Sequence, residues 1–85
     1  MSNFKINKGF ISQKIGHKLS IFDGDESLLY TFNETASFIF AKIKLGWNAA
    51  KIISSLAKKY HIDEMRAKKD TTQLIKELKQ KKIIS

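Results

Sequence analysis

The feature that most constrains the fold is a strand-like run that passes into a helix-like run at Asn33, with no residues left over for a loop. Residues 27–32 are rich in aromatic and β-compatible side chains, which suit a half-buried strand. Directly afterwards, apolar residues recur with helical spacing at Ala36, Ile39, Phe40 and Ile43. The Asn33 side chain can accept a hydrogen bond from a free amide of the first helical turn. The join therefore predicts a sheet edge that is held directly against helices.

Two further strands are expected before this join. Residues 10–15 and 18–22 each show an alternating pattern, and Gly16 and His17 between them are typical of a turn. A second turn is expected at Asp23-Gly24, a pair that favours tight hairpins. Because short turns connect antiparallel neighbours, we expect a meander in the order 1-2-3 with the third strand at an edge.

Three helices are expected after the join. The first runs from about residue 34 to 45 and is stopped by Gly46, while Asn48 and Asp63 are good caps for the second and third. Ile83 and Ile84 are expected to fold back onto the core. The sequence thus predicts an α+β, winged-helix-like fold with a three-stranded antiparallel sheet followed by three helices. This domain is expected over residues 10–85, after a flexible arm formed by residues 1–9.

The composition argues against several classes of function. The 85 residues include no Cys, so no disulfide or thiolate metal site can form, and a reducing cytoplasm is the expected location. No apolar run approaches the ~20 residues of a membrane span. His17 and His61 lack partners at metal-ligand spacing, and no pair of carboxylates is placed for acid–base catalysis. We therefore expect a protein that is not an enzyme and holds no metal or cofactor.

Positive charge is concentrated in the second half of the chain. Residues 1–48 hold six Lys and four acidic residues, giving +2, whereas residues 49–85 hold ten Lys or Arg and four acidic residues, giving +6. This imbalance favours an anionic partner, either a nucleic acid or an acidic peptide. It is equally compatible with a lysine-rich surface that meets only solvent. If the partner is a peptide, we expect it to be acidic and to be steered by lysines on or beside the third helix, namely Lys68, Lys69, Lys76 and Lys79.

The edge of the third strand is the strongest candidate for a binding site. An edge strand offers unpaired N–H and C=O groups, which proteins usually block with Lys or Pro, and residues 27–32 contain neither. An extended peptide can add to such an edge as a further strand. One alternative is a winged-helix DNA-binding regulator, although a single Arg, Arg66, is a thin repertoire for reading bases. Another is a structural subunit that uses the edge for homodimerisation.

The residues around the join also carry a family resemblance. The stretch Tyr30 to Ile39 follows the pattern apolar-x-Phe/Leu-Asn-x-Thr-Ala-x-x-Ile and resembles the PqqD-like proteins. These are also called recognition elements for the precursors of RiPPs, which are ribosomally made and enzymatically modified peptides. Later segments extend the resemblance to about residues 10–85; they are Gly46, Ala49 to Ile53, Leu56 to Tyr60, Ile62-Asp63, Asp70, Leu74 to Leu78 and Ile83-Ile84.

The resemblance implies non-catalytic binding of the leader segment of a precursor peptide by β-strand addition. The leader would be presented to a separately encoded modifying enzyme, such as a radical-SAM enzyme or a leader peptidase. In this family the leader lies between the third strand and the third helix. By that analogy, the expected peptide-binding residues are Leu28, Leu29, Tyr30, Thr31, Phe32, Lys68, Thr71, Leu74, Ile75 and Leu78.

Overall fold

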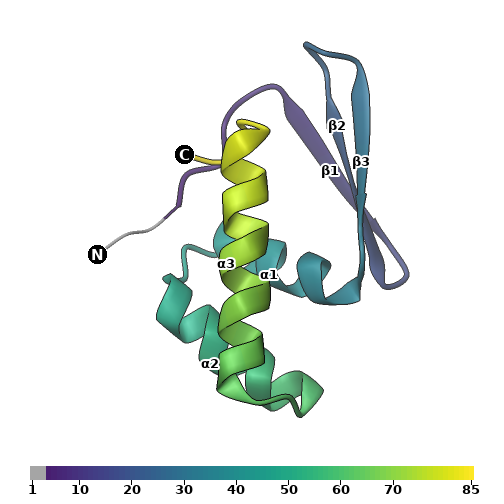
Figure 1. Cartoon of the computed structure of the whole chain (residues 1–85). Helices are drawn as coiled ribbons and strands as arrows, with labels where there is room; N and C mark the ends of the chain where they lie inside the picture. Colours follow the sequence, from purple (N-terminus) through teal and green to yellow (C-terminus); the bar gives the residue numbers. More distant parts are fainter. Residues whose placement is uncertain (1–3) are drawn as a thin grey trace.

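The computed structural model describes residues 4–85. Three strands precede three helices in the order β1 (Phe10–Ile15), β2 (Lys18–Asp23), β3 (Leu28–Phe32), α1 (Glu34–Lys44), α2 (Ala49–Tyr60) and α3 (Glu64–Gln80) (Figure 1). The strands form one antiparallel sheet in the order β1-β2-β3. The predicted α+β fold with β3 at a sheet edge is therefore confirmed. The winged-helix likeness stays a prediction.

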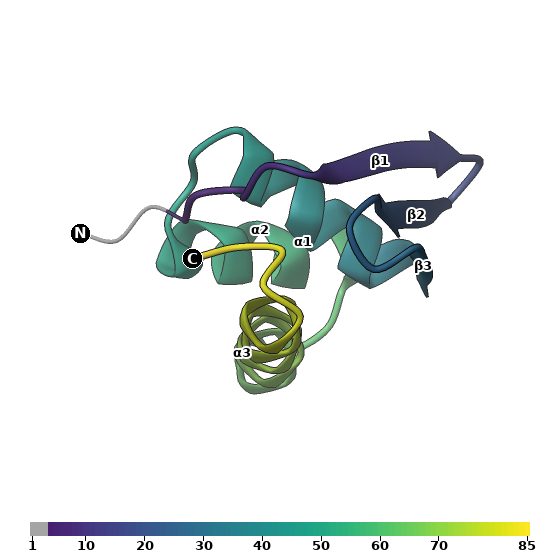
Figure 2. The ribbon, with the colours of Figure 1, turned by 90° about the horizontal axis from the view of Figure 1, so that it is seen from above.

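The helices cover one face of the sheet and leave the other open to solvent. Leu19 and Ile21 of β2 are buried in the core, together with apolar residues of all three helices. On the opposite face, Ile11, Phe22 and Leu29 are aligned across the three strands, and all three are exposed. Seen from above, α3 is viewed along its axis and the sheet extends to one side of the helices (Figure 2).

Each helix begins at the capping residue that the sequence predicts. The Asn33 Oδ1 atom accepts a hydrogen bond of 2.9 Å from the Ala36 amide, at the first turn of α1. Asn48 and Asp63 cap α2 and α3 in the same way. After α1, Gly46 has a φ angle of 86°, a conformation that favours glycine, so the helix ends where the sequence indicates.

The two ends of the described chain pair with each other. Lys5 and Ser85 exchange backbone hydrogen bonds of 3.0 and 2.9 Å, and the Asn7 amide donates to the Ile83 carbonyl at 2.9 Å. Ile83 and Ile84 are buried, so their predicted return onto the core is confirmed. The flexible arm and the domain boundary after residue 9 stay predictions, and residues 1–3 of that arm lie outside the described residues.

Candidate functional site

β3 is an edge strand along its whole length. Among the described residues it pairs only with β2, from Leu19 opposite Phe32 to Asp23 opposite Leu28. The backbone groups of successive residues point to alternate sides of a strand, so every second residue of β3 turns its N–H and C=O toward the unpaired edge. No Lys or Pro lies in β3 to block this edge. The strand can therefore accept a further extended segment as a neighbour.

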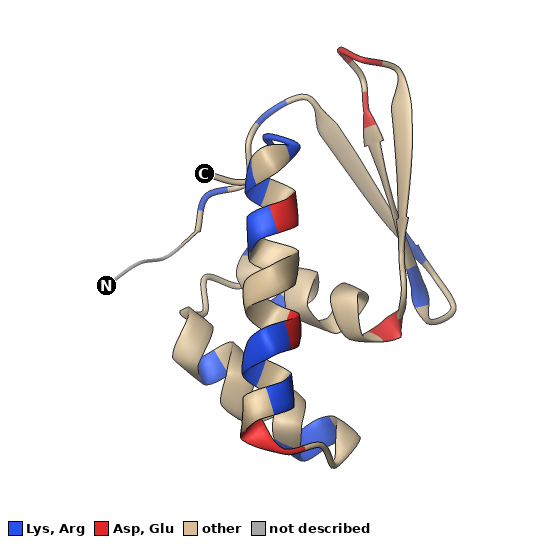
Figure 3. Cartoon of the chain, viewed as in Figure 1, with Lys and Arg blue, Asp and Glu red and all other residues tan. Residues whose placement is uncertain are grey.

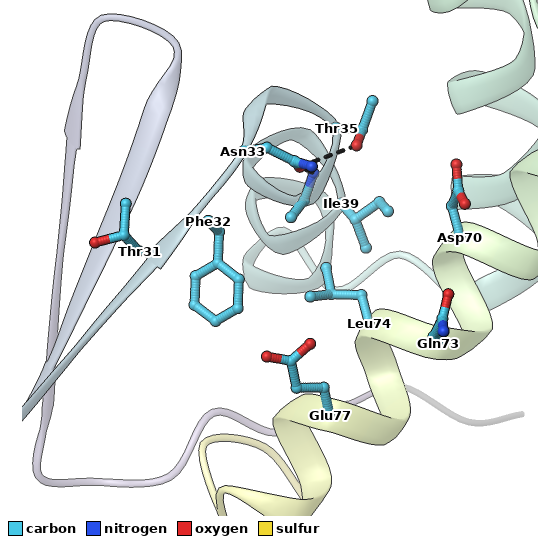
Figure 4. A pocket seen from close by; sticks show the side chains of 10 residues that line it. Thr31, Phe32, Asn33, Thr35, Ile39, Asp70, Gln73, Leu74 and Glu77 are labelled. Atoms are coloured by element: carbon cyan, nitrogen blue, oxygen red, sulfur yellow. Dashed lines mark hydrogen bonds between the residues drawn. The ribbon is translucent and has the colours of Figure 1, made fainter.

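A pocket of about 350 Å³ lies between the end of β3 and α3. We call it the first pocket. Figure 4 shows the side chains of Phe32, Leu74 and Glu77 directed toward the same space. The lining from β3 and its join with α1 consists of Thr31, Phe32, Asn33, Thr35 and Ala36. The lining from the helices consists of Ile39, Asp70, Gln73, Leu74 and Glu77.

A second pocket, of about 540 Å³, lies toward the other end of β3. Its lining includes Leu28 and Tyr30 of β3 and Lys81 at the end of α3. The Nζ atom of Lys81 is 3.2 Å from Oε2 of Glu77, a residue that lines the first pocket. Both pockets therefore lie along β3 beside α3. The two pockets and the β3 edge are called the groove below.

The first pocket is acidic. It contains the carboxylates of Asp70 and Glu77 and no Lys or Arg. Lys68, Lys69 and Lys76 line a separate hollow on another side of α3. In Figure 3 the two red segments along the middle and upper part of α3 lie on the side of the helix that is nearer the sheet. The lysines that were expected to steer an acidic peptide thus lie away from the first pocket.

The predicted site residues of β3 are divided between the two faces of the sheet. Leu28 and Tyr30 line the second pocket, and Thr31 lines the first. Phe32 lines the first pocket and also packs into the core, with 7% of its surface exposed. Leu29 is 65% exposed on the open face of the sheet and lines neither pocket. Its side chain therefore lies outside the groove.

The predicted site residues of α3 lie on different sides of the helix. Of the five, Leu74 lines the groove. Thr71 and Leu78 are buried in the core. Lys68 and Ile75 line shallow hollows on the other side of the helix. The structure thus brings Leu74 together with β3 and places the other four elsewhere.

Sequence reasoning missed the polar residues of the first pocket, which are Asn33, Thr35, Asp70, Gln73 and Glu77. Helical spacing could have identified the members in α3. Asp70, Gln73, Leu74 and Glu77 stand at i, i+3, i+4 and i+7, so they share one face of the helix. Once Leu74 is assigned to the groove, the other residues on the same face of the helix can be assigned to it as well.

The acidic residues of the β2–β3 turn have a structural role. The Asp23 carboxylate accepts hydrogen bonds from the amides of Asp25 and Glu26, at 3.0 and 3.2 Å, as expected for a turn residue. Within residues 4–85, no cluster of three or more His, Cys, Asp or Glu side chains is placed to hold a metal ion. Over the same part of the chain, no helix is long and apolar enough to cross a membrane.

Two solved structures have the same fold as this chain. One is described as "Lasso peptide synthetase B1 complexed with the leader peptide"; it is 19% identical, with a TM-score of 0.91 and coverage of 99% of both chains. The other is described as "TbiB1 in Complex with the TbiA(beta) Leader Peptide"; it is 16% identical, with a TM-score of 0.88 over 95% of this chain and 94% of that chain. At such identities the likeness shows the fold alone. No curated protein matches the chain significantly.

The family of the protein is shown by a match of its sequence to a family model. The family model described as "Coenzyme PQQ synthesis protein D (PqqD)" matches residues 19–84. The matched stretch begins in β2 and includes β3 and all three helices, and so it contains β3 and every residue that lines the first pocket. It covers well over half of the chain, and the protein therefore belongs to the PqqD family.

Proposed function

We propose that this chain binds the leader segment of a ribosomally made precursor peptide by adding it to β3 as a fourth strand. The observation that carries the proposal is the unblocked edge of β3, which runs beside two pockets against α3. Membership of the PqqD family supports it. So do the two solved structures with this fold, since both are described as complexes with a leader peptide.

The geometry of the groove indicates what such a peptide must carry. In an added strand, backbone hydrogen bonds supply affinity, and alternate side chains point toward the helices and supply selectivity. Phe32 and Leu74 form apolar walls in the first pocket, while Leu28 and Tyr30 do so in the second. Because Phe32 is two residues from Tyr30 and four from Leu28, we expect two apolar anchors two to four residues apart in the peptide.

The charge of the first pocket favours a basic residue in the peptide at that end. Asp70 and Glu77 already face Arg66 and Lys81, at 4.0 and 3.2 Å. Exposed ion pairs of this kind contribute only ~0–1 kcal/mol to stability. A Lys or Arg of the peptide can therefore take the place of Arg66 or Lys81 with little loss of free energy. We therefore propose that the peptide carries a cation next to the anchor that enters the first pocket.

In this proposal the chain is a binding module and not an enzyme. It holds the leader while the remainder of the precursor is modified by a separately encoded enzyme. The family resemblance favours a radical-SAM enzyme or a leader peptidase in that role and a cytoplasmic location. Binding by strand addition requires no cofactor. The DNA-binding alternative gains no support from the family or from the two solved structures.

A titration with two ligands tests the proposal. The full chain is titrated with the N-terminal segment of a short precursor peptide sought among the neighbouring genes and, separately, with a random DNA duplex, at about 50 and about 200 mM salt. We expect peptide binding that weakens only modestly with salt, because backbone bonds and apolar anchors are little screened. Binding to phosphates instead falls steeply with salt. Tight, steeply salt-dependent duplex binding without peptide binding would overturn the proposal.

A further inference from the structure

A third pocket lies on the side of α1 that faces away from the groove. It has a volume of about 340 Å³ and is formed by α1, α2, the end of β1 and the turn that follows β1. Successive residues of a helix are about 100° apart, so Ile39, which lines the groove, lies roughly opposite Ser37 and Ala41, which line this pocket. We call it the lysine pocket, after Lys14, Lys42 and Lys59 in its lining.

Aromatic rings form the wall of the lysine pocket and lie against its cations. The rings of Phe38 and Tyr60 meet edge to face, with their centroids 6.0 Å apart. The Nζ atoms of Lys42 and Lys59 lie 5.0 and 5.7 Å from the centroid of the same Phe38 ring. Two ammonium groups from different helices are thus gathered around one apolar surface, and each keeps N–H donors for a further acceptor.

The one carboxylate that lines the lysine pocket, that of Glu34, already has two partners. The Tyr60 hydroxyl donates to Oε2 of Glu34 at 3.3 Å, and Nδ1 of His17 lies 3.9 Å from the same oxygen. Burial, and then the charge and hydrogen bond of Glu34, raise the pKa of Tyr60 above its ordinary value, so the hydroxyl stays a donor at neutral pH. Among residues 4–85, no ion pair joins a carboxylate to any lysine of the lysine pocket. Three cations therefore face one anion.

The lysine-rich surface continues beyond the pocket. Lys42 also lies over the ring of Trp47, at 4.8 Å from its centroid, and Lys51 lies over the same ring at 4.2 Å. A single small anion would occupy only part of this surface, whereas a protein segment with several acidic residues can follow it. A second copy of the chain fits poorly, because each copy carries a net charge of +8.

We propose that the lysine pocket is a docking site for an acidic segment of a partner protein. An Asp or Glu side chain of the partner enters between Lys42 and Lys59, and a neighbouring apolar side chain rests on Phe38. Charge-assisted hydrogen bonds to the two ammonium groups fix the acidic side chain. Because the lysine pocket and the groove lie on opposite faces of α1, such a partner can bind while a leader occupies the groove. That last point alone rests on the function proposed above.

A synthetic peptide of alternating Leu and Glu serves as the probe, and its counterpart with Gln in place of Glu serves as the control. Both are titrated into the isotopically labelled full chain, with amide chemical shifts and the emission of Trp47, the single Trp, as readouts. The Glu peptide is expected to shift amides within residues 37–42 and 57–60 and to change the Trp47 emission. The Gln peptide is expected to leave both unchanged.

Matched charge reversals locate the contact. The double variant K42E/K59E should lose about tenfold or more in affinity for the Glu peptide, because two charge-assisted contacts are replaced by repulsion. The control K44E/K58E makes the same change of net charge on the same two helices at exposed positions outside the lysine pocket. It should retain affinity within about twofold, since long-range charge effects are largely screened. Circular dichroism confirms that both variants fold.

Three results would overturn the inference. The first is equal loss of affinity in both double variants, and the second is a shift pattern centred on the lysines of α3. The third is the same shifts from sodium acetate at an equal concentration of carboxylate, which would show a site for simple anions. Leader binding to the unmodified chain is measured separately, so its absence contradicts the proposed function without deciding this inference.

Discussion

The ammonium group of Lys81 lies 5.2 Å from the centroid of the Tyr30 ring, and so connects the end of α3 with the middle of β3. The same Nζ atom is 3.2 Å from Oε2 of Glu77, one turn back along the helix. The first contact joins two residues of the second pocket, and the second contact joins Lys81 to a residue of the first pocket. A peptide that adds to β3 must therefore pass Lys81 and displace at least one of these contacts.

Removing this side chain is expected to strengthen peptide binding. The variant Lys81→Ala should bind the leader peptide about threefold more tightly, because a partly exposed cation–π contact of ~0.5–1 kcal/mol no longer has to be broken. Isothermal titration calorimetry measures the change. Lys76→Ala, on α3 but outside the groove, is the control and should bind as the unmodified chain does. Weaker binding by Lys81→Ala would instead mean that Lys81 contacts the peptide directly.

The carboxylates of the first pocket are expected to select a basic residue in the peptide. Asp70→Asn and Glu77→Gln should each weaken binding by about two- to fivefold, since each neutral side chain loses an exposed ionic contact worth ~0.2–1 kcal/mol. Replacing the basic residues of the peptide one at a time by Gln should identify one position at which these losses disappear. Glu64→Gln, on α3 outside the groove, is the control. Unchanged binding by both groove variants would contradict the assignment.

Substitutions at Leu29 and at Phe32 are expected to have very different effects on the free energy of unfolding. Phe32→Ala should lower the free energy of unfolding by about 3–5 kcal/mol, because it opens a cavity in the core. Leu29→Ser should change it by no more than about 0.5 kcal/mol, because the side chain is exposed on the open face. Urea denaturation measures both changes. Leu29→Ser should also retain peptide binding, since this side chain lines neither pocket of the groove. Loss of binding would assign the side chain to the site.

The pairing of the chain ends gives a test of the N-terminal arm. Deleting residues 1–9 should lower the free energy of unfolding by about 2 kcal/mol, because Phe4 and Ile6 pack against the core and each buries part of an apolar side chain. The deletion also removes the hydrogen bonds to Ile83 and Ser85. Thermal unfolding by circular dichroism measures the loss. Unchanged stability would support the loose arm that the sequence predicts.

Local chemistry explains what could be predicted from the sequence. The cap at Asn33, the turn at Asp23 and the stop at Gly46 depend on residues within three positions of one another, and the structure confirms all three. Side chains alternate along a strand, so the sequence also indicates that Leu28, Tyr30 and Phe32 share one face of β3. Which residues line the groove was harder to predict from the sequence, because the lining depends on how α3 is rotated about its axis against the sheet.

Tertiary packing sets that rotation. Thr71 and Leu78 are drawn into the core, which turns Asp70 and Glu77 toward β3 and turns Lys68 away. Apolar periodicity identifies the buried stripe of α3 but cannot show which neighbouring residues border a strand far away in the sequence. The lysine pocket could not be predicted from the sequence for the same reason, since its residues come from segments that are far apart in the chain.

Amide hydrogen exchange along β3, with and without the leader peptide, tests the central claim most directly. Every second amide between residues 28 and 32 points toward the unpaired edge and should exchange slowly only in the complex. The intervening amides already bond to β2 and should change little. This alternating protection is the predicted result. A bound peptide that leaves the edge amides of β3 unprotected would contradict binding by strand addition.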